Sequence, residues 1–181
     1  MNRDVWKMKK NILFTGRPGV GKTTVIMRLI SGLKEVGGFY TEEIRQKGER
    51  KGFRIVTLRG KKGILAHKAL KSPYRVGKYG VNIEDLENIA GRSISLAVND
   101  DKKKIILIDE IGRMELYSTK FQESVIKALD SPKRVIATLQ ERHNKFTDAI
   151  RKREDVEFIE VTLENRKILP EELKKEFSDA G

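Results

Sequence analysis

The sequence contains no cysteine, only two histidines and no long apolar run. Without cysteine the chain forms no disulfide, no thiolate metal site and no covalent intermediate on a thiol. The two histidines, His67 and His143, lie far apart, so a histidine-based metal site is not expected. No stretch approaches the roughly 20 apolar residues of a membrane span, and the first ten residues lack the apolar segment of a secretory signal. We therefore expect a cytoplasmic protein that does not contact a membrane.

Negative charge is in short supply, because 26 Asp and Glu face 38 Lys and Arg, a net charge of +12. Such an excess is typical of nucleic-acid-binding proteins. It is also typical of the charge-rich surfaces of thermophile proteins and of clefts that bind phosphate-rich nucleotides. The basic residues are spread along the chain and not gathered in one arm, which favours the second interpretation. Nucleic acid remains an open partner.

The strongest pattern is a glycine-rich stretch between an apolar segment and a helix-like segment. Residues 16–23 have the spacing G-x-x-x-x-G-K-[ST] of the phosphate-binding loop (P-loop) of nucleotide-binding proteins. Residues 11–15 predict a short buried strand, and apolar residues recur at helical spacing from Val25 to Leu33. Glycines let such a loop turn its N–H groups toward an anion, and the helix adds the positive end of its dipole. The predicted nucleotide-binding residues are Gly16, Arg17, Pro18, Gly19, Val20, Gly21, Lys22, Thr23 and Thr24.

A second chemical element is the acidic pair Asp109 and Glu110 at the end of an apolar run. Residues 105–108 predict a central strand buried on both faces, and its carboxyl end lies where open α/β sheets place their ligands. We predict that Thr23 and Asp109 are Mg²⁺ ligands and that Asp109 also belongs to the nucleotide site. Lys22 and Glu110 are the predicted catalytic residues. Lys22 contacts the β- and γ-phosphates, and Glu110 aligns the attacking water. A purely structural role for the acidic pair is the alternative.

Strand-like and helix-like segments alternate, which predicts an α/β fold with three layers and a mostly parallel central sheet. Between about residues 38 and 67, three strand-like segments joined by short Gly-containing turns predict an antiparallel meander that extends the sheet. Asn82 and Ser118 are predicted to cap two helices. Residues 68–80 predict a basic loop, either a lid over the nucleotide or an exposed connection. We expect residues 1–181 to form a single P-loop NTPase domain.

Three more side chains are candidates at the same edge of the sheet. Arg113 and Arg142 are candidate arginine fingers, with an exposed loop position as the alternative for Arg142. Thr138, at the end of a predicted strand, either senses the γ-phosphate or is an ordinary strand residue. Residues 109–112 also fit the D-x-x-G pattern of GTPases. The partner pattern N-K-x-D is not met, because residues 144–148 contain one residue too many, so a guanine-specific switch is disfavoured.

Several motifs together resemble a known family. They are residues 16–24, 38–45, 52–55, 76–82 and 109–116, the last reading Asp-Glu-Ile-Gly-Arg-Met-Glu-Leu. This combination resembles the thermophile-type nucleoside-triphosphatases, whose animal members are called cancer-related nucleoside-triphosphatases. The resemblance covers nearly the whole chain from the first predicted strand to the last. One departure is Ala-Gly-Arg-Ser at residues 90–93, where the family pattern has Ile-Pro after the alanine, and it concerns the path of the predicted helix.

The resemblance implies a Mg²⁺-dependent hydrolase that converts nucleoside 5′-triphosphates, ATP and GTP among them, to diphosphate and phosphate with loose base preference. It also implies an extra strand, here residues 134–138, between the P-loop strand and the acidic strand. Two other functions stay open from the residues themselves. One is a nucleotide or nucleic-acid kinase whose acceptor binds at the 68–80 loop, and the other is a nucleotide-gated nucleic-acid-binding module. We expect a monomer.

Overall fold

The computed structural model describes residues 8–178, and nine strands form one continuous sheet across them. The strand order is β5-β6-β4-β3-β2-β7-β8-β1-β9. Strands β2, β7, β8, β1 and β9 are parallel, whereas β3, β4, β6 and β5 continue the sheet as antiparallel neighbours. The strands are β1 (Asn11–Thr15), β2 (Val36–Gln46), β3 (Glu49–Thr57), β4 (Lys62–His67), β5 (Arg75–Val76), β6 (Tyr79–Val81), β7 (Ile105–Ile111), β8 (Arg134–Leu139) and β9 (Val156–Glu160).

This arrangement confirms the predicted α/β fold, with a mostly parallel sheet extended by an antiparallel meander. Strand β8 lies between the P-loop strand β1 and the acidic strand β7, as the family resemblance implies. The order places the carboxyl ends of β1, β8 and β7 side by side. The prediction that the whole chain is a single domain stays a prediction.

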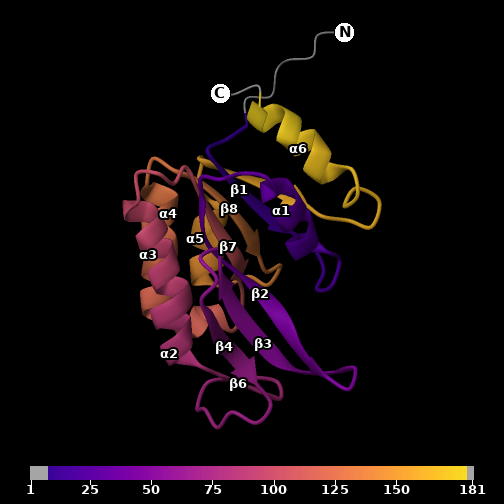
Figure 1. The fold of residues 1–181 in the computed structure, drawn as a ribbon, viewed down its shortest axis with the longest axis vertical. Helices are drawn as coiled ribbons and strands as arrows, with labels where there is room; N and C mark the ends of the chain where they lie inside the picture. Colours follow the sequence, from indigo (N-terminus) through magenta and orange to yellow (C-terminus); the bar gives the residue numbers. More distant parts are fainter. Residues whose placement is uncertain (1–7, 179–181) are drawn as a thin grey trace.

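Helices cover both faces of the sheet (Figure 1). Helices α3 and α4 pack on one face, and α1 and α6 pack on the other. Alternate side chains of β1 show why two cores form, since Leu13 belongs to one core and Ile12 and Phe14 to the other. The helical elements are α1 (Lys22–Ile30), α2 (Ile83–Asp85), the π-helical turn η1 (Leu86–Gly91), α3 (Arg92–Asn99), the 3₁₀ turn η2 (Glu115–Tyr117), α4 (Thr119–Asp130), α5 (Lys145–Arg151) and α6 (Leu169–Ser178).

The helix predicted from residue 83 forms, but its middle is irregular. Asn82 caps it, with its side-chain oxygen accepting a hydrogen bond from the Asp85 N–H at 3.1 Å. The π-helical turn at Leu86–Gly91 comes directly before α3 and contains the Ala-Gly pair where the sequence departs from the family pattern. The chain therefore stays helical through residues 90–93, where its sequence differs from the family pattern. Ser118 caps α4 in the same way, accepting from the Phe121 N–H at 3.1 Å.

The loop prediction for residues 68–80 is wrong in its second half. Strands β5 and β6 form a short hairpin whose inner strand pairs with β4. The Tyr79 side chain is buried against Phe53, with ring centroids 5.4 Å apart. Strands of two and three residues are too short to show alternation in a sequence, and the unpaired edge of β4 supplies the partner that orders them.

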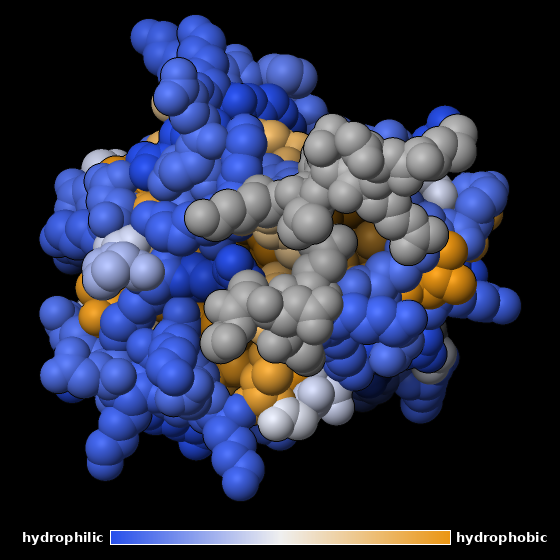
Figure 2. Space-filling view, turned by 90° about the horizontal axis from the view of Figure 1, so that it is seen from above, coloured by the Kyte–Doolittle hydropathy of each residue, from blue (hydrophilic) through white to orange (hydrophobic). Residues whose placement is uncertain are grey.

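The surface is largely polar. Figure 2 shows hydrophilic side chains over most of the face seen from above, with smaller hydrophobic patches between them. In residues 8–178, no helix is both long and apolar enough to cross a membrane.

A substitution at Phe121 tests how α4 packs on the sheet. Its side chain is fully buried and meets Phe39 edge to face, with ring centroids 6.0 Å apart. We expect Phe121→Ala to lower the free energy of unfolding by about 3–5 kcal/mol, because it leaves a cavity in the core. Chemical denaturation measures the change. Leu163→Ala is the control, since Leu163 is 63% exposed and should change stability little, and equal effects of the two would contradict this packing.

Candidate active site

The P-loop joins β1 to α1 through a series of glycines with left-handed backbone conformations. Gly16, Gly19 and Gly21 have φ values of 130°, 79° and 109°, which residues with side chains rarely adopt. Gly16 is also fixed by space, because a Cβ there would lie 2.6 Å from the Val161 carbonyl oxygen. Helix α1 then begins at Lys22 without a side-chain cap at Gly21. Its first N–H groups are left for a ligand, which is the arrangement of an anion site.

Lys22 points back along the loop. Its side chain is buried, and Nζ donates hydrogen bonds to the carbonyl oxygens of Gly16 at 2.7 Å and Arg17 at 3.3 Å. An ammonium group has three N–H donors, so one remains for a ligand. The ammonium group thus lies against the loop backbone, and its contact with the β- and γ-phosphates stays a prediction.

Asp109 is the point where four elements meet. Its side chain has no exposed surface, and it accepts hydrogen bonds from the hydroxyls of Thr23 at 2.8 Å and Thr138 at 2.6 Å and from the Thr41 backbone N–H. Burial raises the pKa of Asp109, and the three hydrogen bonds oppose that rise. Thr138, for which a γ-phosphate sensor and an ordinary strand residue are the two predicted roles, is fully buried and donates its hydroxyl hydrogen to Asp109.

The residues present fit a Mg²⁺ ion that is shared with a triphosphate. The Thr23 hydroxyl and one Asp109 carboxylate oxygen lie side by side at the start of α1. Magnesium prefers oxygen ligands and commonly takes one or two from the protein and the rest from phosphate and water. Among residues 8–178, no cluster of three or more His, Cys, Asp or Glu forms a self-sufficient metal site. The two predicted ligands are therefore suited to an ion that arrives with its nucleotide.

Glu110 and Glu115 form a second pair of acids beside Asp109. Burial raises the pKa of Glu110, and the Asp109 charge raises it further, whereas Lys22 opposes the rise. Glu115 is fully enclosed, and burial followed by the Glu110 charge raises its pKa to about 8. Both carboxyl groups lie close to Gly112, where a Cβ would lie 2.8 Å from a Glu110 oxygen and 3.0 Å from a Glu115 oxygen. The raised pKa of Glu115 favours its protonated form at neutral pH, next to the predicted catalytic carboxyl.

A cavity of about 850 Å³ joins these groups. Its walls include Gly16, Pro18, Gly19, Gly21, Lys22, Thr23, Glu110, Arg113 and Arg142 among the predicted residues. Four others do not line it. Asp109 is fully buried, Arg17 and Thr24 are exposed, and Val20 packs against the core. Both candidate arginine fingers are exposed and reach the cavity, and which of them acts stays a prediction.

Comparison with known proteins decides the family. Residues 11–174 match the sequence model of a family described as NTPase.

The chain belongs to this NTPase family.

Relatives of this NTPase match almost end to end. The nucleoside-triphosphatase THEP1 of Thermotoga sp. strain RQ2 is 52% identical over 90% of this chain and 92% of the relative. A crystal structure of THEP1 from Aquifex aeolicus superimposes with a TM-score of 0.81 at 40% identity, over 90% of this chain and 96% of that one. The solution structure of a human cancer-related nucleoside triphosphatase gives 0.81 at 36% identity, over 95% and 99%. The predicted family and enzyme class, a nucleoside-triphosphatase, are confirmed.

Sequence reasoning missed three groups in the site of this NTPase. Glu115 lies in the family motif, but only the fold of the η2 turn brings it beside Glu110. The Thr41 N–H reaches Asp109 through the pairing of β2 with β7. Arg166, after β9, donates to the Val20 carbonyl oxygen at 3.1 Å and lies against Gly21. No local pattern points to Arg166, since it lies far along the chain from the P-loop that it contacts.

The raised pKa of Glu115 gives a testable pH dependence. An unfolded chain ionises this carboxyl near 4.5, the folded chain only near 8, so its protonated form favours folding below 4.5 and this contribution is lost as pH rises toward 8. In Glu115→Gln we expect a shallower fall in the free energy of unfolding between pH 5 and pH 8, by up to about 1.4 kcal/mol per pH unit. Urea denaturation without nucleotide or metal measures it.

The matched control is Glu84→Gln, an exposed position on α2. It should leave the pH dependence unchanged. If Glu115→Gln and the parent protein gave parallel stability curves across this range, Glu115 would not be neutral in the folded protein.

Proposed function

We propose that this NTPase hydrolyses nucleoside 5′-triphosphates, ATP and GTP among them, to diphosphate and inorganic phosphate in a Mg²⁺-dependent reaction with loose base preference. One observation carries the proposal. The P-loop with Lys22 forms one wall of the cavity, Glu110 forms the wall beyond it, and Thr23 touches both the cavity and Asp109. A triphosphate held by the loop therefore presents its last phosphate to a carboxylate.

Each residue has a separate task in this proposal. The P-loop N–H groups and Lys22 bind the phosphate oxygens and stabilise the negative charge that develops on them. Thr23 and Asp109 hold Mg²⁺, which when bound neutralises charge on the β- and γ-phosphates. Glu110 accepts a hydrogen bond from the attacking water and keeps it in line with the γ-phosphorus. Because the transition state is largely dissociative, orientation matters more than base strength.

Residues 144–148, which resemble the guanine-binding pattern N-K-x-D but contain one residue too many, support loose base preference. The Asn144 side chain accepts a hydrogen bond from the Thr147 N–H at 2.9 Å, and the Thr147 hydroxyl accepts one from the Asn144 N–H at 3.0 Å. This reciprocal pair caps α5. Asn144 is therefore engaged in starting a helix and is not presented for reading a base.

A kinase is the second candidate, because the cavity extends past the P-loop toward the meander. Its far wall contains Arg50, Phe53 and Tyr79. The Arg50 guanidinium lies over both rings, 5.1 Å from the Phe53 centroid and 5.8 Å from that of Tyr79. Aromatic rings and a guanidinium suit a planar acceptor. Glu110 favours the hydrolase, since a carboxylate that orients water would waste ATP in a kinase.

The cellular setting also belongs to the proposal. A cytoplasmic location rests on the cysteine-free sequence. A monomeric state stays a proposal, and nucleic-acid binding stays a prediction from the net charge of +12. An ATP-dependent gel shift with RNA or DNA at low salt tests that last prediction.

A substrate panel tests the proposed reaction most broadly. Phosphate release is measured for ATP, GTP, CTP and UTP with Mg²⁺ and with excess chelator. We expect all four to be hydrolysed at similar rates with Mg²⁺ and none without it. Release of ADP that rises severalfold when nucleosides or oligonucleotides are added, without a matching rise in phosphate, would assign the kinase function instead.

Glu110→Gln separates catalysis from binding. The amide keeps the size of the side chain but loses the charge that orients water. We therefore expect unchanged triphosphate affinity and a turnover that falls by at least about 10²-fold. Single-turnover phosphate release and nucleotide titration measure the two quantities. Near parental phosphate release would remove Glu110 from the mechanism, and Glu84→Gln serves as the exposed control.

Lys22→Ala tests the phosphate-binding wall. Loss of the ammonium group should weaken triphosphate binding and also lower turnover, together by about 10²–10³-fold in kcat/KM. Steady-state kinetics measures the change, and Lys34→Ala is the control because Lys34 is exposed beyond the end of α1. Unchanged kinetics would mean that the loop does not hold the reacting phosphate.

A further inference from the structure

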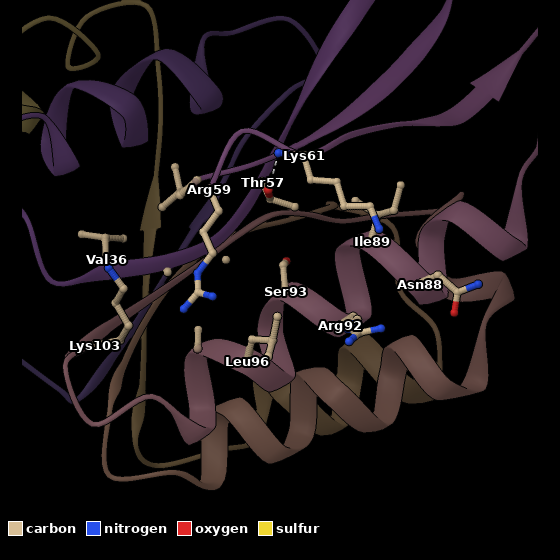
Figure 3. Close-up of a pocket in the computed structure, with 14 residues that line it drawn as sticks. Val36, Thr57, Arg59, Lys61, Asn88, Ile89, Arg92, Ser93, Leu96 and Lys103 are labelled. Carbon is tan, nitrogen blue, oxygen red and sulfur yellow. Dashed lines mark hydrogen bonds between the residues drawn. The ribbon is translucent and has the colours of Figure 1, made fainter.

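A second cavity, of about 380 Å³, opens between helix α3 and the strands β2 and β3 (Figure 3). We call it the α3 pocket, and its walls include Arg59, Lys61, Ile89, Arg92, Leu96 and Lys103. It shares no lining residue with the cavity that contains the P-loop. In Figure 3, the α3 side chains lie on one side of the pocket, and those of β3 and the turn that follows it lie on the other.

The α3 pocket lies at the opposite end of strands that also form the active site. Gly38 of β2 lines the pocket, whereas Thr41, three residues further along the same strand, lines the active-site cavity and bonds Asp109. That spacing is about 10 Å along an extended strand. Lys103 lies two residues before β7, whose other end carries Asp109 and Glu110. The pocket is thus separate from the phosphate site but built on the same two strands.

The pocket wall is positively charged. Four of its lining residues are lysine or arginine and none is a carboxylic acid. Two of these cations have partners nearby, since Arg59 pairs with Asp100 at 2.9 Å and Lys103 donates to the Lys34 carbonyl oxygen at 3.3 Å. Within residues 8–178, the side chains of Arg92 and Lys61 make no hydrogen bond or ion pair. Two exposed cations without a carboxylate partner of their own therefore line the pocket.

The same pocket offers an apolar surface and a buried hydroxyl. Leu96 lines the pocket with 43% of its surface exposed, and it lies one turn from Arg92. Thr57 is 6% exposed, and its oxygen accepts a hydrogen bond from the Lys61 N–H at 3.0 Å. The Thr57 hydroxyl hydrogen has no acceptor among the described residues. It remains available to an oxygen in the pocket.

We propose that the α3 pocket binds a small organic phosphate. The phosphate lies between Arg92, Lys61 and the Thr57 hydroxyl, because guanidinium and ammonium groups bind phosphate oxygens more strongly than neutral donors do. The apolar body covers Leu96, which removes exposed apolar surface from water. A dianion matches two unpaired cations better than a carboxylate does. The volume is that of a small-ligand site, and the proposal is independent of what the P-loop binds.

Phenyl phosphate is the probe, because it combines one dianionic phosphate with one apolar ring. Two-dimensional ¹H–¹⁵N NMR of the full chain follows its titration. We expect saturable shifts at the backbone amides of Gly37, Leu58 and Ser93, which line the pocket. Binding at the P-loop would appear separately at Gly19 and Gly21. Phenol and inorganic phosphate, which each lack one half of the probe, should shift the pocket amides much less at equal concentration.

Two sets of variants assign the contacts. Removing both free cations in the double variant Lys61→Gln and Arg92→Gln should weaken binding at the pocket by about tenfold, and Leu96→Ala should weaken it severalfold. Arg28→Gln is the matched control, an exposed arginine on α1 across the sheet, and should bind like the parent protein.

Three results would overturn the proposal. They are shifts confined to the P-loop amides, equal shifts by phenol and phenyl phosphate, and unchanged affinity in the double variant. A change in nucleotide turnover would bear on the proposed hydrolase and not on this pocket, so the two proposals fail separately.

Discussion

The site depends on a buried carboxylate that is held from three directions. Asp109 has no exposed surface, and an ionised group in such a place is costly unless it is compensated. Hydroxyls from α1 and β8 and an N–H from β2 supply that compensation. The same bonds fix the position of the P-loop helix relative to the acidic strand. A metal ion brought with a nucleotide would add the positive charge that this carboxylate still lacks.

The strand order makes this arrangement possible. Because β8 lies between β1 and β7, Thr138 at its end is directly beside Asp109, and the P-loop is one strand further away. A cavity of about 850 Å³ is lined by both the loop and Glu110. Glu115 lies beside Glu110, and its raised pKa favours the neutral form. The two adjacent carboxyl groups therefore need not both be ionised. What distinguishes this cavity from the rest of the sheet edge is that the cation of Lys22 and the carboxyl groups of Asp109 and Glu110 lie close together.

Much of the fold could be predicted because its signals are local. The P-loop, the apolar strand that ends in Asp109 and the caps at Asn82 and Ser118 depend on neighbouring residues, and the structure contains each of them. The hairpin of β5 and β6 was missed because its strands are ordered by the edge of β4 and not by their own pattern. Glu115, Thr41 and Arg166 reach the site only through tertiary contacts.

The same distinction holds for chemistry. A motif shows which side chains are suited to bind phosphate and metal, but not which residues pack around them or hydrogen-bond to them. The burial that raises the pKa of Glu115 to about 8 comes from packing around η2, and the role of Thr138 comes from strand register. The α3 pocket is a further example, because its cations come from the turn after β3, from α3 and from the turn before β7, which share no sequence pattern.

The most direct test of the account is a crystal structure of the protein with Mg²⁺ and a non-hydrolysable ATP analogue. The account predicts that the ion is bound by Thr23 and by Asp109, directly or through water, and that the γ-phosphate lies between Lys22 and Glu110. A structure in which the triphosphate occupies the P-loop while Glu110 and the Asp109 end of β7 face a different part of the molecule would contradict it.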